Sequence, residues 1–147
     1  MAFQYSHRTG GDSVIPIKEF PSTENKTYVK GYTAALSSGL ITNGGAADTA
    51  IVGVVQETIA TATTAGDPVK VILALSDVIF KVDYVAGSKT SLTDADIGTA
   101  FDLKSTALNK IDLDDTTDGA WVVVDYDNTA GVAWVKCLAA KKSLVVN

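Results

Sequence analysis

The stretch that decides the fold class runs from Gly44 to Leu75 and contains GGAADTAIVGVVQETIATATTAGDPVKVILAL. It alternates small residues with β-branched ones and holds no lysine or arginine before Lys70. Valine and threonine lose side-chain freedom in a helix and fit a pleated strand, and turn residues separate the two apolar runs. The stretch therefore predicts two strands, over residues 50–58 and 68–75, joined by a turn.

The rest of the chain has the same bias. Alanine, valine, threonine and glycine make up 65 of the 147 residues, and the hydrophobic fraction of 46% is that of a globular protein. Alternating patterns predict further strands, which cover residues 26–36, 76–87, 110–113, 120–126 and 132–138. Thr93 and the acidic residues after it could begin a helix, but Gly98 reduces this segment to a corner. Strands at roughly ten-residue spacing predict an all-β protein, a small β-barrel or a β-sandwich.

The first 25 residues differ from this pattern. They contain two of the three prolines and a pair of glycines, which is typical of an extended N-terminal arm. We therefore divide the chain into an arm, residues 1–25, and a single β domain, residues 26–147. Within the arm Pro16 permits an edge strand and forbids a central one. The apolar run around it packs either on its own domain or on a neighbouring protein.

We expect the contacts with a partner to come from this run and from the tyrosines that follow it. Such an apolar segment can add a strand to the edge of a neighbour's sheet, with side-chain pockets giving specificity. The candidate partner-binding residues are Val14, Ile15, Ile17, Phe20, Tyr28 and Tyr32.

Charge and hydropathy limit the other partners. The formal net charge is −5, Arg8 is the only arginine, and no basic cluster offers a surface for a phosphate backbone, so we expect no nucleic-acid partner. The amino terminus lacks the apolar core of a signal peptide, and no run is long enough to span a bilayer, so we expect no membrane association.

No group of residues predicts catalysis or a cofactor. His7 is the only histidine and lies in the arm, which is a poor platform for a general base. Cys137 is the only cysteine and alternates with apolar neighbours, which is typical of a small buried side chain. We predict no catalytic residues, no cofactor and no enzymatic activity.

Two weaker candidate sites deserve a structural test. Asp112, Asp114, Asp115 and Asp118 could supply oxygen ligands to calcium, but the spacing departs from a calcium loop and favours an acidic turn. Trp121 and Trp134 flank the predicted DNTAG turn and, if they face each other across the hairpin, could form with Tyr126 a platform for a sugar. We favour core or interface packing for them over a glycan site.

One part of the chain resembles a known family. The run AADTAIVGVVQETIATATTAGDPVKVILALSDVIFKVDY, and the later SLTDADIGTAFDLKS and KIDLDDTTDGAWVVVDYD, are similar to capsid decoration (cement, or head stabilisation) proteins of tailed bacteriophages. The resemblance covers roughly residues 28–136. It consists of a similar composition and a similar spacing of strand and turn residues. It implies a virion protein that is assembled in the host cytoplasm. Such a protein binds the lattice of the major capsid protein as an oligomer, usually a trimer.

The leading hypothesis is therefore a structural virion protein that decorates and stabilises a phage capsid. Two alternatives remain open. One is a phage tail or head-fibre component, and the other is a carbohydrate-binding β module that uses Trp121 and Trp134.

Overall fold

The computed structural model describes residues 2–10, 13–45 and 50–141 and is almost entirely β. Two short 3₁₀ turns, Asp94–Asp96 and Ala139–Lys141, are the helical elements within these ranges. The strands are β1 (Gln4–Arg8), β2 (Ile17–Pro21), β3 (Thr33–Ser37), β4 (Leu40–Asn43), β5 (Ile51–Val55), β6 (Pro68–Leu73), β7 (Val78–Val85), β8 (Ala100–Phe101), β9 (Leu103–Lys104), β10 (Ala107–Asp112), β11 (Trp121–Asp127) and β12 (Val132–Cys137).

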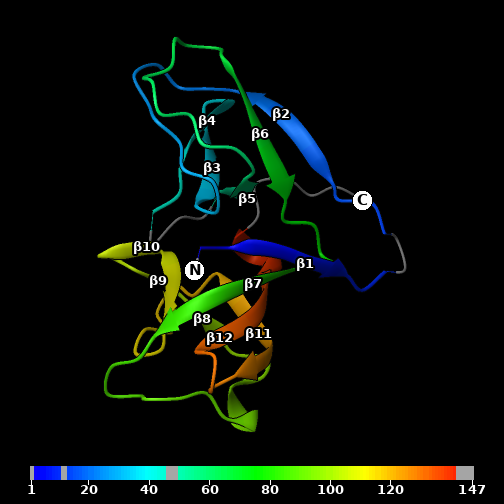
Figure 1. The fold of residues 1–147 in the computed structure, drawn as a ribbon, viewed down its shortest axis with the longest axis vertical. Helices are drawn as coiled ribbons and strands as arrows, with labels where there is room; N and C mark the ends of the chain where they lie inside the picture. The colour runs from blue at the N-terminus through cyan, green and yellow to red at the C-terminus, as the bar shows by residue number, and fades with distance from the viewer. Residues whose placement is uncertain (1, 11–12, 46–49, 142–147) are drawn as a thin grey trace.

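The strands form two stacked sheets, which Figure 1 shows as a lower and an upper half. The lower, seven-stranded sheet has the order β8-β11-β12-β7-β10-β9, and β1 also pairs with β7. Only Asp102 separates β8 from β9, so one extended segment pairs with β11 at its start and with β10 at its end. This segment joins the two edges of the sheet into a nearly closed barrel.

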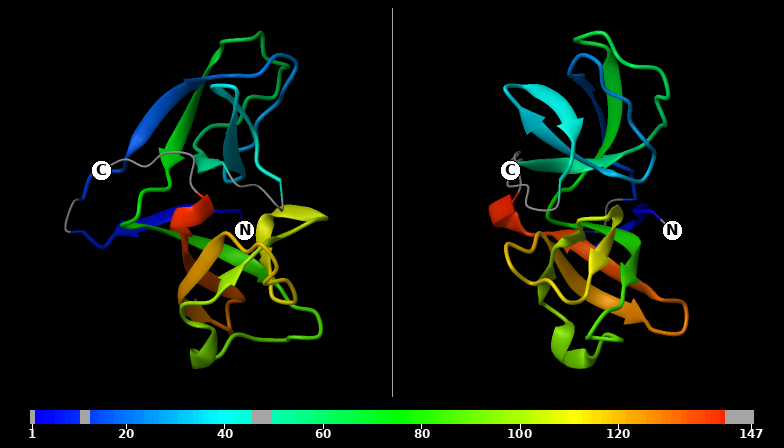
Figure 2. Two further views of the ribbon diagram at one scale, coloured as in Figure 1. Left: turned by 180° about the vertical axis from the view of Figure 1, so that it is seen from behind. Right: turned by 90° about the vertical axis from the view of Figure 1, so that its left-hand side faces the viewer.

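The upper, five-stranded sheet has the order β2-β6-β5-β3-β4. It curls so that its first and last strands approach each other, as the second view in Figure 2 shows. A bridge between Ser22 and Ile41 joins them at one end, where the Thr23 N–H donates to the Ile41 carbonyl over 3.0 Å. The all-β prediction of a small barrel or sandwich is confirmed.

Each sheet has its own core, and the cores differ in the size of their side chains. In the seven-stranded sheet Trp121 packs against the rings of Phe3 and Phe80, with centroids 4.6 and 5.9 Å away. The core of the five-stranded sheet consists mainly of valine, isoleucine and alanine around Phe20 and Tyr28. Side chains on the outer face of the five-stranded sheet pack down onto the aromatic core and hold the two halves together; they are Ile51, Val54 and Ile72.

The small residues of the five-stranded sheet have a specific role at Gly53. This glycine lies in β5 between β3 and β6, and a Cβ added there would come within van der Waals overlap of the Ile72 carbonyl oxygen. The backbones of neighbouring strands therefore approach more closely than any side chain permits. Glycine is therefore the residue that fits at position 53 of β5.

The N-terminal 25 residues contribute a strand to each sheet. β1 pairs with β7 in the lower half and β2 pairs with β6 in the upper half, so the described part of the predicted arm lies against the chain's own sheets. Pro16 precedes β2, which is an edge strand, as the proline predicts. The strand predicted over residues 26–36 begins only at Thr33, because Gly31 takes a positive φ of 88° and turns the chain.

The other predicted strands agree with the structure within a few residues, and Thr93 begins a 3₁₀ turn rather than a helix, as expected. No helix among the described residues has both the length and the apolar character that crossing a membrane requires.

Candidate functional site

The outer edge of β2 is the first candidate interaction site. The Leu73 N–H donates to the Pro16 carbonyl and the Ser22 N–H to the Asp67 carbonyl, so even-numbered residues of this strand point their backbone groups at β6. Antiparallel ladders alternate, and the backbone groups of Ile17 and Glu19 therefore point away from β6. Within the described residues the bridge to β4 begins only at Ser22, which leaves the edge at Ile17–Phe20 open.

Exposed apolar side chains flank this edge. Val14, Ile15 and Ile17 are 67%, 41% and 42% exposed. Among the residues that the structure describes, the two other large hydrophobic residues with comparable exposure are Val29 and Ile97, which lie elsewhere in the chain. Three exposed aliphatic side chains within four residues, beside open backbone donors and acceptors, form a surface suited to another extended chain. We call residues 14–19 the edge segment.

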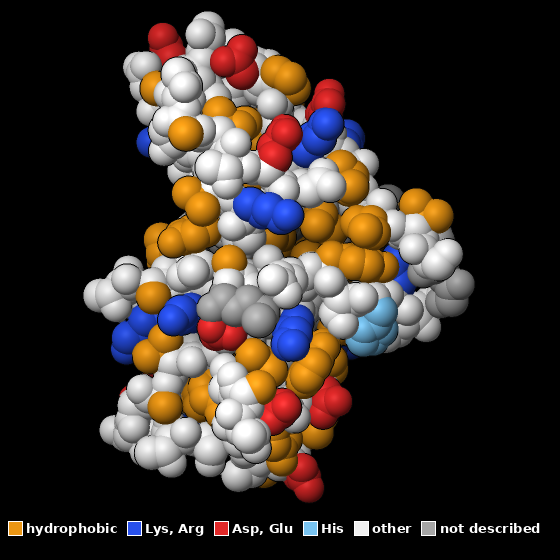
Figure 3. Space-filling model, in the orientation of Figure 1, with side chains coloured by type: hydrophobic (Ala, Val, Ile, Leu, Met, Phe, Trp, Pro, Cys, Tyr) orange, Lys and Arg blue, Asp and Glu red, His pale blue; other side chains and the backbone are white. Residues whose placement is uncertain are grey.

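The edge segment borders a groove at the waist between the two sheets. Ile15 lines this groove, which has a volume of about 360 Å³, together with Phe3, Tyr5, Val54 and Ile72. Figure 3 shows hydrophobic side chains gathered at the waist, with lysine or arginine side chains among them. The apolar surface around the edge segment is therefore continuous with the junction of the two halves.

The remaining candidate partner-binding residues lie in different surroundings. Phe20 and Tyr28 belong to the core of the five-stranded sheet, and the Tyr28 hydroxyl donates to the Ile41 carbonyl over 2.8 Å. Burial is the main cause that raises the pKa of Tyr28. Tyr32 is half-buried. Of the six candidates, Val14, Ile15 and Ile17 are the exposed ones.

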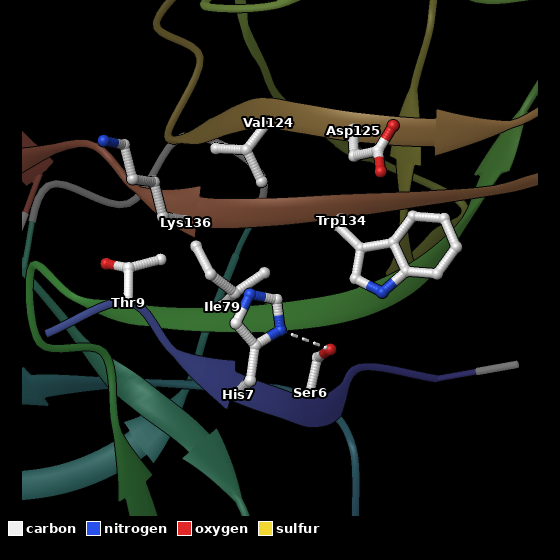
Figure 4. A pocket seen from close by; sticks show the side chains of 8 residues that line it. All are labelled: Ser6, His7, Thr9, Ile79, Val124, Asp125, Trp134 and Lys136. Carbon is white, nitrogen blue, oxygen red and sulfur yellow. Dashed lines mark hydrogen bonds between the residues drawn. The ribbon is translucent and has the colours of Figure 1, made fainter. Parts of the chain in front are cut away.

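A second candidate site lies on the outer face of the seven-stranded sheet. It is a hollow of about 400 Å³ formed by four neighbouring strands or their continuations, and its lining residues are Ser6, His7, Thr9, Ile79, Val124, Asp125, Trp134 and Lys136. Figure 4 shows Ile79 near its middle, Lys136 toward one end and Asp125 with Trp134 toward the other. Ile79 is only 2% exposed, so it forms an apolar floor beneath polar walls.

The facing of Trp121 and Trp134 that a sugar platform would need does not occur, and Trp121 belongs to the core, as the favoured interpretation has it. Trp121 lies opposite Cys137 and points into the aromatic core, whereas Trp134 lies opposite Asp125 and lines the outer hollow. A β-bulge between Val123 and Asp125 adds one residue to β11 and reverses the parity of the hairpin there. Counting residues from the turn could not reveal this bulge, and a platform that uses both tryptophans is excluded.

The four aspartates of the acidic loop make contacts within the protein. Asp112 accepts from Lys104 Nζ at 3.0 Å, and Asp114 accepts from the backbone N–H groups of Ser88 and Lys89, both at 2.8 Å. These two backbone bonds are the main cause that lowers the pKa of Asp114. Asp115 accepts from the Thr117 N–H, and Asp118 lies 3.6 Å from Lys141 Nζ. No group of three or more metal-ligating side chains converges anywhere in the described ranges.

Asp102 is a buried acid that the sequence did not single out. It lies at the seam between β8 and β9 and is 5% exposed. Burial raises its pKa to about 6, while the Leu103 N–H, which donates to Oδ1 over 2.8 Å, opposes that shift. Asp115 adds to the rise, as a neighbouring negative charge does. Alternation with the apolar neighbours Phe101 and Leu103 predicts that Asp102 faces solvent, so its burial could not be predicted from the local sequence.

The two nucleophile or base candidates lie on opposite faces of the seven-stranded sheet, His7 in the outer hollow and Cys137 in the core. His7 Nδ1 is 2.9 Å from Ser6 Oγ on the exposed face of β1. Cys137 is buried in the aromatic core, as its apolar neighbours predict.

Searches against protein-family models, curated protein sequences and solved structures find no match to this chain.

Proposed function

We propose that this chain is a structural virion protein that decorates and stabilises the capsid of a tailed phage by binding the major capsid protein lattice. The observation that carries the proposal is the open edge of β2 beside the exposed side chains of Val14, Ile15 and Ile17. The family resemblance supplies the identity of the partner, and the edge segment supplies the means of binding.

The edge segment suits strand addition. The outward backbone groups of Ile17 and Glu19 can pair with an extended segment of a capsid subunit, and the aliphatic side chains can enter pockets beside it. β2 is held by β6 along its full length, and its Phe20 side chain is buried in the core of the five-stranded sheet. A partner therefore meets a preformed strand and does not have to order a free arm, which lowers the entropic cost of binding.

An oligomer strengthens such binding. We expect a homo-oligomer, most simply a trimer, because the decoration proteins that the chain resembles commonly form one. Linked copies that bind neighbouring capsid subunits raise one another's effective concentration, so contacts of modest area become an assembly that rarely dissociates. The proposal assigns no role to the acidic loop or to a cofactor.

The test uses capsid shells of the phage that encodes the chain, prepared without it. Added protein should co-sediment with the shells and raise the temperature at which they break open. Ile17→Asp should weaken co-sedimentation at least tenfold, because it places a charge in an apolar contact. Ile97→Asp is the matched control, since Ile97 is similarly exposed at 49% but lies at a corner of the other sheet.

Failure of the unaltered protein to bind any shell would contradict the proposal. Equal binding of the Ile17→Asp and Ile97→Asp variants would contradict the assignment of the edge segment. Projecting particles on the virion that leave shell stability unchanged would favour the tail or head-fibre alternative.

A further inference from the structure

We infer that the hollow on the outer face of the seven-stranded sheet is a binding site for an acidic sugar, a pyranose ring that carries a carboxylate. The hollow is separate from the edge segment, and this inference does not rest on the proposed function. Its volume of about 400 Å³ falls in the range of small-ligand pockets.

Two β-bulges aim side chains into this hollow. In β1 the register with β7 shifts between Tyr5 and His7, so that Tyr5 packs against the core while His7 lies opposite Ile79 on the outer face. In a regular strand these two residues would share a face. The second bulge, between Val123 and Asp125 in β11, places Asp125 opposite Trp134 on that same face. Bulges that redirect side chains are concentrated next to functional sites, and here both redirect polar groups toward one hollow.

The hollow offers the two kinds of contact that a sugar ring needs. Half-buried Trp134 and the floor residue Ile79 supply apolar surface for the C–H face of a pyranose. His7, Thr9 and Asp125 supply hydrogen-bonding groups around it. Asp125 Oδ1 accepts from the Tyr126 N–H at 2.8 Å, an interaction that fixes the carboxylate and leaves the other oxygen for a hydroxyl group.

Charge selects an acidic sugar over a neutral one. Lys136 lines one end of the hollow, and Lys81 Nζ lies 5.4 Å from the centre of the Trp134 ring. Within the lining Lys136 and Asp125 balance each other, and outside it Lys81 and Asp83 both lie on the outward face of β7, so the position of Lys136 and not a net charge favours a carboxylate. Lys136 and Asp125 lie toward opposite ends (Figure 4), so a ligand carboxylate can pair with Lys136 while ring hydroxyls face Asp125.

The test follows the indole N–H signals of the two tryptophans by NMR during titration with D-glucuronate or D-galacturonate. D-glucose is the control for the ring and acetate is the control for the carboxylate. A uronate should shift the Trp134 signal in a saturable way, with millimolar affinity. The signal of Trp121, which is buried in the core, should stay in place and serves as the internal reference.

Three variants separate stacking from charge. Trp134→Ala should abolish the saturable response of backbone amides around the hollow. Lys136→Gln should weaken uronate binding about tenfold or more, because a hydrogen bond to a charged group typically contributes at least that much. Lys70→Gln, on the exposed face of β6 in the other sheet, removes the same charge and should leave binding unchanged.

Several results would overturn the inference. They are the absence of saturable binding by either uronate, an equal response to glucose, an acetate response that matches the uronate response, and an equal effect of Lys70→Gln and Lys136→Gln. An unshifted Trp121 signal in each variant shows that the fold is retained, so loss of binding cannot be attributed to unfolding.

Discussion

The two sheets use the same β pattern in different ways. The five-stranded sheet is built from small and β-branched residues and brings backbones close together at Gly53. The seven-stranded sheet encloses large rings, including Phe80 and Trp121, and carries two bulges that turn polar residues outward. The five-stranded half presents an open strand edge, and the seven-stranded half presents a hollow. The two proposals thus assign main-chain recognition to the five-stranded sheet and side-chain recognition to the seven-stranded sheet.

The largest difference in the free energy of unfolding should appear between variants of the two tryptophans. Trp121→Ala should lower the free energy of unfolding by about 3–5 kcal/mol, because it removes a fully buried ring from the core of the seven-stranded sheet. Trp134→Ala should cost about 1 kcal/mol or less, since the ring is half-buried and its main partner is the Lys81 ammonium. Urea unfolding of both variants measures the contrast. Similar losses would mean that Trp134 is part of the core.

Close backbone packing in the five-stranded sheet should make Gly53 nearly as sensitive. Gly53→Ala should cost about 2–3 kcal/mol, because the new methyl group overlaps the Ile72 carbonyl in a neighbouring strand. Gly66→Ala is the matched control: nothing lies within 4 Å of the added Cβ, and its φ of 91° makes the strain a local backbone effect of about 1 kcal/mol. Equal losses in urea unfolding would show that β5 has room to move.

The free energy of unfolding should depend on pH through Asp102, which lies at the seam between β8 and β9. Burial raises the pKa of this carboxyl to about 6, so the folded state holds a proton that the unfolded state releases near pH 4. Asp102 therefore stabilises the folded state least above pH 6, and its contribution falls as the pH rises from about 4 to about 6.

Asp102→Asn keeps an oxygen that can accept from the Leu103 N–H and cannot ionise. The variant should be more stable than the original chain by about 1–2 kcal/mol at pH 7.5, and this advantage should disappear near pH 4. Urea unfolding at several pH values gives the difference curve. A difference that is flat across this range would show that the pKa of Asp102 is not raised.

The smallest expected effect concerns calcium. The carboxylates of the acidic loop already accept from backbone N–H groups of this and a neighbouring loop or lie beside Lys104 and Lys141, so millimolar calcium should move the melting temperature by less than about 1 °C. Differential scanning calorimetry with calcium and with a chelator measures this. A rise of several degrees would indicate that the loop rearranges into a cation site.

Composition and alternation predict the all-β class and most strands, because a pleated strand imposes a period of two on its side chains. They do not predict the features that depend on which strands pair and in which register. The bulges at Ser6 and Val124 change which residues share a face, and each leaves no mark in the local sequence. The partners of β1 and β2 lie more than 45 residues away, so the apolar run around Pro16 was compatible with either its own sheet or a neighbour.

The candidate sites, too, could be predicted from the sequence only in part. Exposure of Val14, Ile15 and Ile17 agrees with a partner surface, whereas Phe20 and Tyr28 are buried because the five-stranded sheet curls around them. The hollow could not be predicted, since its lining comes from four separate segments of the chain.

The central claim is that a partner adds a strand to the edge of β2, and Glu19→Pro tests it most directly. Proline at this position removes a backbone N–H that points away from β6, so the β2–β6 ladder remains intact while the outer edge loses a donor. Glu19→Gln is the matched control, because it removes the same charge and keeps the N–H. Deletion of residues 1–25 is unsuitable, since it would remove both β1 and β2.

Co-sedimentation with capsid shells is the measurement. We expect Glu19→Gln to bind as the original chain does and Glu19→Pro to bind at least tenfold more weakly, with both variants folded by circular dichroism. Equal binding by the two variants would contradict strand addition at β2.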